Sequence, residues 1–248
     1  MAASTLHPGR DRGDLDIAGS LVAATRLVVR DFAQTGLPIG LALLASLSPV
    51  FIAGSLVLMS HLAALLTDLD ANSDPTQLLE ALIDLGFGVG IGLLATLLLS
   101  GLIFGGIWRI AMAAARGQPA GFGLLRTGIT DLWPMAVGLT WWQLATLVGL
   151  MACYLPGLAL MTLLAFFPIP IIDRGLSGTD AVALSWRLTE GHRLEILLWG
   201  LLANLALSIL QVVTLGIGSA FFGLPVLMTT MTLVYDNLAR RYPERLPP

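Results

Sequence analysis

Charged side chains that could do chemistry are few in this sequence, and one group of them borders an apolar segment. Asp173 and Arg174 are adjacent at the end of that segment, and Arg187 and His192 follow in the next polar stretch. Because guanidinium groups bind phosphate strongly, these four side chains are candidates for contact with lipid headgroups. The alternative is that Asp173 neutralises Arg174 or caps the following segment. An enzyme acting on lipid phosphates would need all four to converge at one interfacial pocket.

Uncharged polar side chains near or within apolar segments form a second group of candidates: Gln143, Asn204, Gln211 and His61. An amide is costly in hydrocarbon unless it is paired, so Asn204, near the middle of its segment, is expected to face the interior of a helix bundle. Two roles remain open for these residues. As interhelical hydrogen bonds they would be paired helix to helix, whereas as the lining of a transport path they would surround a polar cavity.

The sequence predicts no catalytic residue, metal site or cofactor. The H-E-x-x-H and G-x-S-x-G patterns are absent, and the three histidines are scattered. The single cysteine, Cys153, cannot form an internal disulfide or a cysteine-based metal cluster. We therefore expect a protein that is not an enzyme.

The composition is typical of a membrane protein. The chain has 248 residues, of which 56% are hydrophobic and 12% are charged, about half the charged fraction of an ordinary soluble domain. This is too little charge to cover a soluble protein of this size, so lipid is expected to cover much of the surface. A net charge of −3 argues against a nucleic-acid partner, which would require a basic stripe.

A transmembrane helix needs about 20 apolar residues, and six apolar segments reach or approach this length. Their expected bounds are 38–62, 84–108, 134–155, 157–172, 194–214 and 217–236. The fourth segment is short and broken near Pro168 and Pro170, so a tilted or re-entrant course is an alternative there. The sequence "YLPG" at 154–157 separates the third and fourth segments, and "TLGIGS" at 214–219 separates the last two.

The arginines predict the orientation. With six spans, every arginine-bearing segment falls on one side of the membrane, and the positive-inside rule assigns that side to the cytoplasm. We therefore expect a multi-pass protein of the bacterial cytoplasmic (inner) membrane with both termini in the cytoplasm. The segment 67–84, "TDLDANSDPTQLLEALID", contains acidic residues and no arginine, as expected of an external loop. Cation binding by its carboxylates is the alternative.

The predicted fold is an all-α polytopic membrane helix bundle of about six spans in three hairpins, with interfacial amphipathic helices on the cytoplasmic side. Residues 1–18 are expected to be a flexible cytoplasmic tail, 19–240 a single membrane domain and 241–248 a second cytoplasmic tail. In one amphipathic segment, Ser177 and Thr179 are candidate N-caps. The apolar residues expected to face the membrane interface there are Ala181, Leu184, Trp186 and Leu188.

Small residues mark one face of the second segment: Gly86, Gly90, Gly101 and Gly105. They form two small-xxx-small pairs, which let helix backbones approach closely. This face could be the seam of a homodimer or a contact with a neighbouring helix of the same chain.

The most specific stretch is "FFPIPIIDRGLSGTDAVALSWRLTEGHRLEILLWGLLANLAL", and the chain closes with "GLPVLMTTMTLVYDNLARR". Together with a turn formed by Leu155, Pro156 and Gly157, these stretches resemble poorly characterised bacterial six-span integral membrane proteins. Those proteins are similar to the membrane domain of glycerophosphoryl diester phosphodiesterases. The resemblance covers roughly 105–240 and implies a fold and a compartment. Because no catalytic residue is among its motifs, it implies no activity.

The expected function is non-enzymatic: a membrane scaffold or accessory subunit that packs with a partner protein or lipids. The absence of catalytic groups and of deeply buried charges supports this interpretation. The alternative is a transport or export component for an amphiphilic or lipid-like substrate. The expected partners are membrane lipids together with a protein partner or a second copy of the chain.

Overall fold

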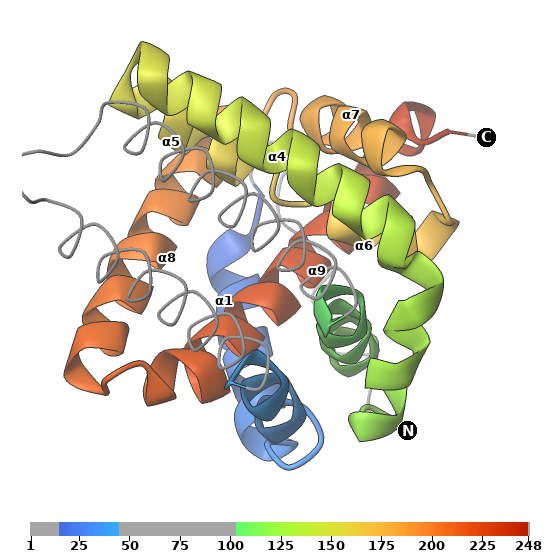
Figure 1. Cartoon of the computed structure of the whole chain (residues 1–248), viewed down its shortest axis with the longest axis vertical. Helices are drawn as coiled ribbons and strands as arrows, with labels where there is room; N and C mark the ends of the chain where they lie inside the picture. Colours follow the sequence, from blue (N-terminus) through green and yellow to red (C-terminus); the bar gives the residue numbers. More distant parts are fainter. Residues whose placement is uncertain (1–14, 45–102, 248) are drawn as a thin grey trace, which may run out of the picture.

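The computed structural model describes residues 15–44 and 103–247. Every regular element within these two ranges is helical, which confirms the predicted all-α class (Figure 1). Most of the first two expected spans lies outside the described residues, as does the acidic segment 67–84.

Three helical stretches are long and apolar enough to cross a membrane: Phe122–Ala152, Pro156–Arg174 and Arg193–Val213. The first joins the 3-10 helix η1 (Phe122–Asp131) to α4 (Leu132–Ala152), and the third is α8. A shorter apolar helix, Ile103–Ala115, ends the second expected span. These helices indicate a membrane-embedded protein, because their apolar surface requires lipid or protein around it.

Helices α4 and α5 (Tyr154–Leu163) form a tight antiparallel hairpin around one extended residue, Cys153. The expected "YLPG" break is therefore displaced, since Pro156 and Gly157 lie in the first turn of α5. Proline is tolerated there because first-turn N–H groups have no intrahelical partner. A Cβ atom added to Gly149 would lie 2.8 Å from the Cα atom of Gly157, so glycines allow this close approach.

The chain breaks again after α5, as the two prolines predict. Residues 164–167 form a bend and turn, and α6 (Pro168–Arg174) begins at Pro168. Its end is capped by Gly175, whose φ of 65° suits a glycine. Phe166 and Phe167 in the turn are both 2% exposed and anchor it in the core.

Helix α7 (Gly178–Leu188) begins as predicted, because the Ser177 hydroxyl accepts a hydrogen bond from the Asp180 amide at 3.2 Å. Its apolar face differs from the prediction. Ala181, Leu184 and Leu188 are buried within the protein, where α7 packs on α4 and α6. The bundle itself therefore covers three of the four residues that were expected at the membrane interface, while Trp186 is exposed.

The second described hairpin joins α8 (Arg193–Val213) to α9 (Leu224–Arg241) through a turn at 214–216, where the "TLGIGS" sequence predicts a break. The turn includes Leu215 and Gly216, both with positive φ. A short π-helix, η2 (Ser219–Gly223), precedes α9 and divides the sixth expected span. Helix α1 (Ile17–Arg30) packs along α9 through Ala24 and Val28.

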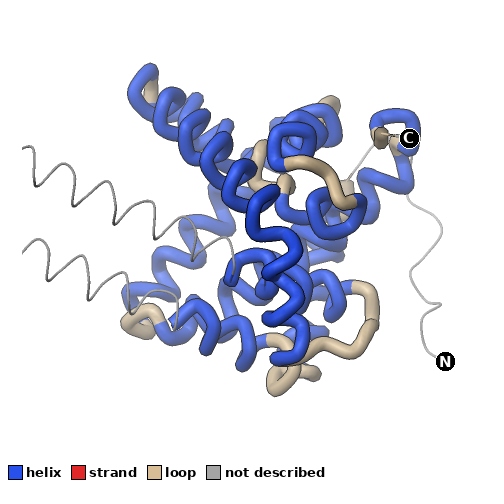
Figure 2. The backbone as a smooth tube through the Cα atoms, turned by 45° about the vertical axis from the view of Figure 1, so that its right-hand side comes forward, coloured by secondary structure: helices blue, strands red, loops and turns tan. Residues whose placement is uncertain are grey.

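Helix α9 runs through the described bundle, with α1, the helix Ile103–Ala115 and α6 around it (Figure 1). Figure 2 shows the described residues as helices joined by loops. Tyr235 and Leu238 of α9 are each 1% exposed. After α9, the 3-10 helix η3 (Pro243–Arg245) turns back onto α7. The beginning of the expected C-terminal tail is thus docked on the bundle.

Candidate ligand cavity and the Arg116 cluster

A cavity of about 230 Å³ lies among the helix Ile103–Ala115, the α4–α5 hairpin, α8 and α9. None of the lining residues within the described ranges is ionisable, and aromatic and methionine side chains dominate these walls. The lining residues are Phe104, Trp108, Trp142, Met161, Thr162, Ala165, Phe167, Trp199, Gly200, Asn204, Leu224, Leu227, Met228 and Met231. An apolar cavity of about 150 Å³ can already hold a benzene molecule.

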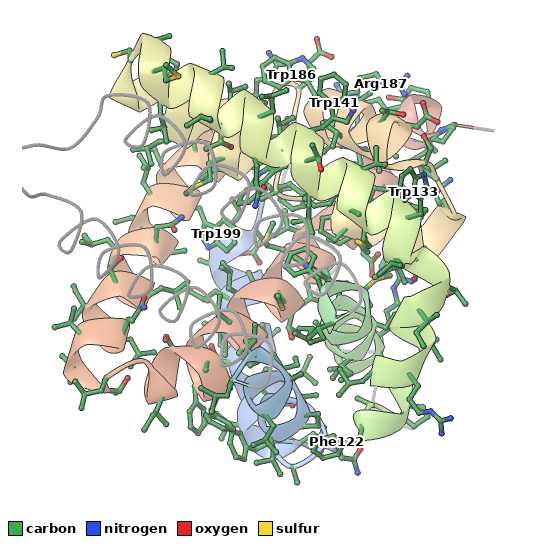
Figure 3. All side chains as sticks on the ribbon, viewed as in Figure 1. Phe122, Trp133, Trp141, Trp186, Arg187 and Trp199 are labelled. Atoms are coloured by element: carbon green, nitrogen blue, oxygen red, sulfur yellow. The ribbon has the colours of Figure 1, made fainter. Side chains whose placement is uncertain are left out.

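Three tryptophans from three different elements contribute to these walls. Trp142 donates its indole N–H to the carbonyl oxygen of Met161 at 2.9 Å, which fixes its ring against α5. Trp108 is 3% exposed, and its indole N–H has no partner among the described residues. Trp199 extends from α8 toward the centre of the molecule (Figure 3). Trp142 and Trp199 are far apart along the chain, and their similar depth in two apolar segments is the sequence feature that allows an aromatic cage.

Asn204 is the one predicted intramembrane amide that lines this cavity, but the residue is exposed rather than enclosed in the bundle as expected. Its Nδ2 atom donates to the carbonyl oxygen of Gly200, 2.8 Å away and four residues earlier in the same helix. The amide therefore makes no interhelical hydrogen bond among the described residues. Gln143 lines a separate open groove on α4, and Gln211 is exposed near the end of α8. His61 lies outside the described residues.

The predicted glycine face is described only at Gly105. A Cβ atom there would lie 3.3 Å from the carbonyl oxygen of Gly128 in η1, so this glycine packs within the chain. Gly86, Gly90 and Gly101 lie outside the described residues. Close to Gly105, Arg109 donates to the Asp131 carboxylate from Nε at 2.8 Å and from Nη2 at 2.5 Å. The helix Ile103–Ala115 is thereby tied to the end of η1.

Arg116 forms the centre of a charged cluster at the end of the helix Ile103–Ala115. Its Nη1 donates to Asp173 at 2.5 Å, while Nη2 and Nε donate to the two carboxylate oxygens of Asp236 at 2.8 Å and 3.2 Å. Arg174 lies farther away, with its Nε 3.9 Å from the Asp173 carboxylate. Asp173, which the sequence offers as a headgroup contact, is therefore paired within the protein. The spacing of Arg116, Asp173 and Asp236 in the sequence gives no sign of this cluster.

The two carboxylates stabilise the charged form of Arg116. Hydrogen bonds from its guanidinium to Asp236, and then to Asp173, raise the pKa of Arg116 above its ordinary value, although desolvation acts in the opposite direction. The side chains of Arg116 and Asp236 are 29% and 16% exposed, so water screens the pairs only in part. Arg116 remains charged wherever the protein is folded.

His192 lies in a different network. Its side chain is 7% exposed, with Nδ1 3.1 Å from a Glu195 carboxylate oxygen and Nε2 3.1 Å from the Tyr242 hydroxyl. Arg245 stacks on the Tyr242 ring and donates to the carbonyl oxygen of Glu190 at 2.6 Å. These contacts dock the C-terminal segment on the turn between α7 and α8.

The four predicted headgroup contacts are therefore divided. Asp173 and Arg174 belong to the Arg116 cluster, whereas His192 holds the C-terminal segment. Arg187 is exposed on α7, where its carbonyl oxygen accepts from Arg245 at 3.4 Å. Arg193 stacks on the indole ring of Trp186, with its Cζ atom 3.9 Å from the ring centroid. No described contact joins all four predicted residues at one pocket.

Comparison of the chain with protein-family models, curated proteins and solved structures finds no match in any of the three.

Proposed function

We propose that this membrane protein handles an amphiphilic or lipid-like substrate and binds an uncharged, apolar part of it in the tryptophan-lined cavity. One observation carries the proposal: a cavity of about 230 Å³ beside Asn204, in a membrane-embedded helix bundle, whose described lining contains no ionisable residue. Ligand pockets are commonly apolar concave sites with a few polar groups that set orientation. The protein acts as a transport or handling component without chemistry of its own.

The polar groups of the lining restrict the ligand further. The hydroxyl of Thr162 donates to its own helix, and Trp142 donates to a backbone carbonyl. Asn204 donates one amide hydrogen to the carbonyl oxygen of Gly200, and its side-chain carbonyl oxygen remains available as an acceptor. A charged headgroup would find no counter-ion among the described lining residues. This lining fits a hydrocarbon or isoprenoid-like segment that carries at most a hydroxyl or ester group.

The scaffold interpretation depends on different surfaces. Helix α8 exposes an apolar face that includes Leu198, Leu202, Leu205 and Ile209. Such a face fits surrounding lipid as well as a partner helix, so it does not favour a scaffold. Asn204, the strongest candidate for an interhelical bond, is paired to its own helix instead.

Native mass spectrometry of the gently extracted protein tests the proposal with two matched variants. Ala165→Leu narrows the cavity, whereas Ala206→Leu places the same larger side chain on the exposed surface of α8, outside the lining. We expect a retained apolar molecule on the wild type and on Ala206→Leu, with clearly less on Ala165→Leu. Equal retention by both variants, or none by the wild type, would overturn the proposal. A stoichiometric second polypeptide without a bound small molecule would support the scaffold role.

A further inference from the structure

We propose that Arg116 is a positioning residue that holds the walls of the cavity together, so that loss of its ion pairs opens the cavity and weakens ligand binding. The effect on ligand binding rests on the proposed function. The effect on the cavity walls depends on the contacts of Arg116 alone and is tested separately.

Arg116 connects three elements of the bundle. Arg116 directly follows the helix Ile103–Ala115, Asp173 lies in the last turn of α6, and Asp236 lies in α9. One guanidinium therefore joins three elements that are far apart in the sequence.

The same three elements carry part of the cavity wall. Trp108 belongs to the helix Ile103–Ala115, Phe167 immediately precedes α6, and Met231 belongs to α9. All three side chains are almost completely buried. A relative shift of any of these elements would change the cavity, because packed interiors have little free volume to absorb it.

Arginine is suited to this position by its geometry. Its planar guanidinium carries five N–H donors in a rigid fork, so it can bind two carboxylates at once in fixed directions. Here it uses Nε and Nη2 on Asp236 and Nη1 on Asp173. A lysine has a single compact ammonium and cannot reproduce this fork. Arg116→Lys should therefore hold the cavity walls together only in part.

Arg109 provides a matched control on the same helix. It too binds an aspartate with two guanidinium nitrogens, and the side chains of Arg109 and Asp131 are 27% and 13% exposed. Its partner Asp131 ends η1, which contributes no lining residue, and η1 continues into α4. Arg109→Gln removes one comparable ion pair, at a point eleven residues before Trp142, the first lining residue of α4.

Opening of the cavity can be measured without any ligand. In a Cys153→Ser background, Met231→Cys places a thiol in the cavity wall, where Met231 is 5% exposed. A small apolar maleimide then reports access to this thiol. We expect Arg116→Gln to raise the labelling rate about fivefold or more, the lower end of ordinary couplings between sites. Arg109→Gln should leave the rate within about twofold of the reference.

The outcomes separate this proposal from the previous one. Equal labelling rates in Arg116→Gln and Arg109→Gln would overturn the positioning role, whatever the reference protein binds. Faster labelling in Arg116→Gln, with no molecule retained by the wild type, would support the positioning role and reject the proposed function. If Arg116→Gln does not fold, Asp173→Asn and Asp236→Asn each weaken one of the two ion pairs of Arg116. Unchanged labelling in both of these variants would then reject the proposal.

Discussion

At the scale of single residues, polar side chains in the apolar helices bond mainly within their own helix. The hydroxyls of Thr140 and Thr146 donate to carbonyl oxygens four residues earlier, as does the amide of Asn204. Such bonds satisfy a polar group in an apolar setting without a partner helix. A sequence shows that these groups need partners but does not show whether the partner is local. Asn204 is the clearest case.

Asn204→Leu should therefore change stability little. The carbonyl oxygen of Gly200 keeps its backbone partner in the helix, so removal of the amide leaves no new unpaired group. We expect a change in unfolding free energy of less than about 0.5 kcal/mol, below the average for interhelical hydrogen bonds in membranes. Reversible unfolding in mild detergent measures it. A loss of about 1 kcal/mol or more would indicate a partner that Asn204 makes across the bundle.

Ser185 should behave differently because its hydrogen bond joins two elements. Ser185 of α7 is fully buried, and its hydroxyl donates to the carbonyl oxygen of Leu163 at the end of α5, 2.8 Å away. Ser185→Ala should lower the unfolding free energy by about 1 kcal/mol. Ser208→Ala is the control, since Ser208 is exposed and bonds only to Asn204 of its own helix. Equal effects in the two variants would contradict this distinction.

At the scale of elements, close backbone contacts determine how the helices pack. Gly178 begins α7 against α4, and a Cβ atom there would lie 2.4 Å from the carbonyl oxygen of Pro134. This contact brings Ala181 and Leu184 into the core and away from lipid. The amphipathic pattern of α7 predicts which residues share a face, but it does not identify what covers that face. Lipid and protein interior are both apolar.

Gly178→Ala should loosen the contact between α4 and α7. The added methyl group would meet backbone atoms that cannot rotate away, and overpacking of this kind costs about 1–3 kcal/mol. Gly123→Ala in η1 is the matched control, because no atom lies within 4 Å of its added Cβ. Thermal unfolding compares the two variants, and a stable Gly178→Ala protein would show that α7 can shift without cost.

At the scale of the whole molecule, contacts at Arg116 bring together the C-terminal ends of the second, fourth and sixth expected spans. The turns at Cys153 and at 214–216 lie on the opposite side from the C-terminal segment (Figure 1). Six spans with alternating direction would produce this arrangement. The orientation of the molecule in the membrane stays a prediction from the arginines.

Cysteine labelling in intact cells tests that orientation. Cys153 is exposed between α4 and α5 and is the single cysteine of the chain, so no background has to be removed. We expect a membrane-impermeant maleimide to label it from outside. In a Cys153→Ser background, Thr179→Cys, at an exposed position of α7, should react only after the membrane is permeabilised. The reverse pattern would place the arginine-rich side outside.

The sequence by itself determined the helical class, the membrane setting and several helix boundaries. Apolar length, proline and glycine act locally, so the break before Pro168 and the turn at 214–216 were predictable. Local rules misplaced the α4–α5 turn, because proline fits the first turn of a helix as readily as it fits a loop.

Tertiary structure decided everything that depends on which helices are neighbours. It paired Arg116 with Asp173 and Asp236, buried the apolar face of α7, and placed Trp142 and Trp199 around one cavity. These contacts join residues far apart in the sequence, and an apolar helix packs acceptably against lipid or many other apolar helices. Only the few close backbone contacts and directional ion pairs select one arrangement, and the sequence does not show which of them form.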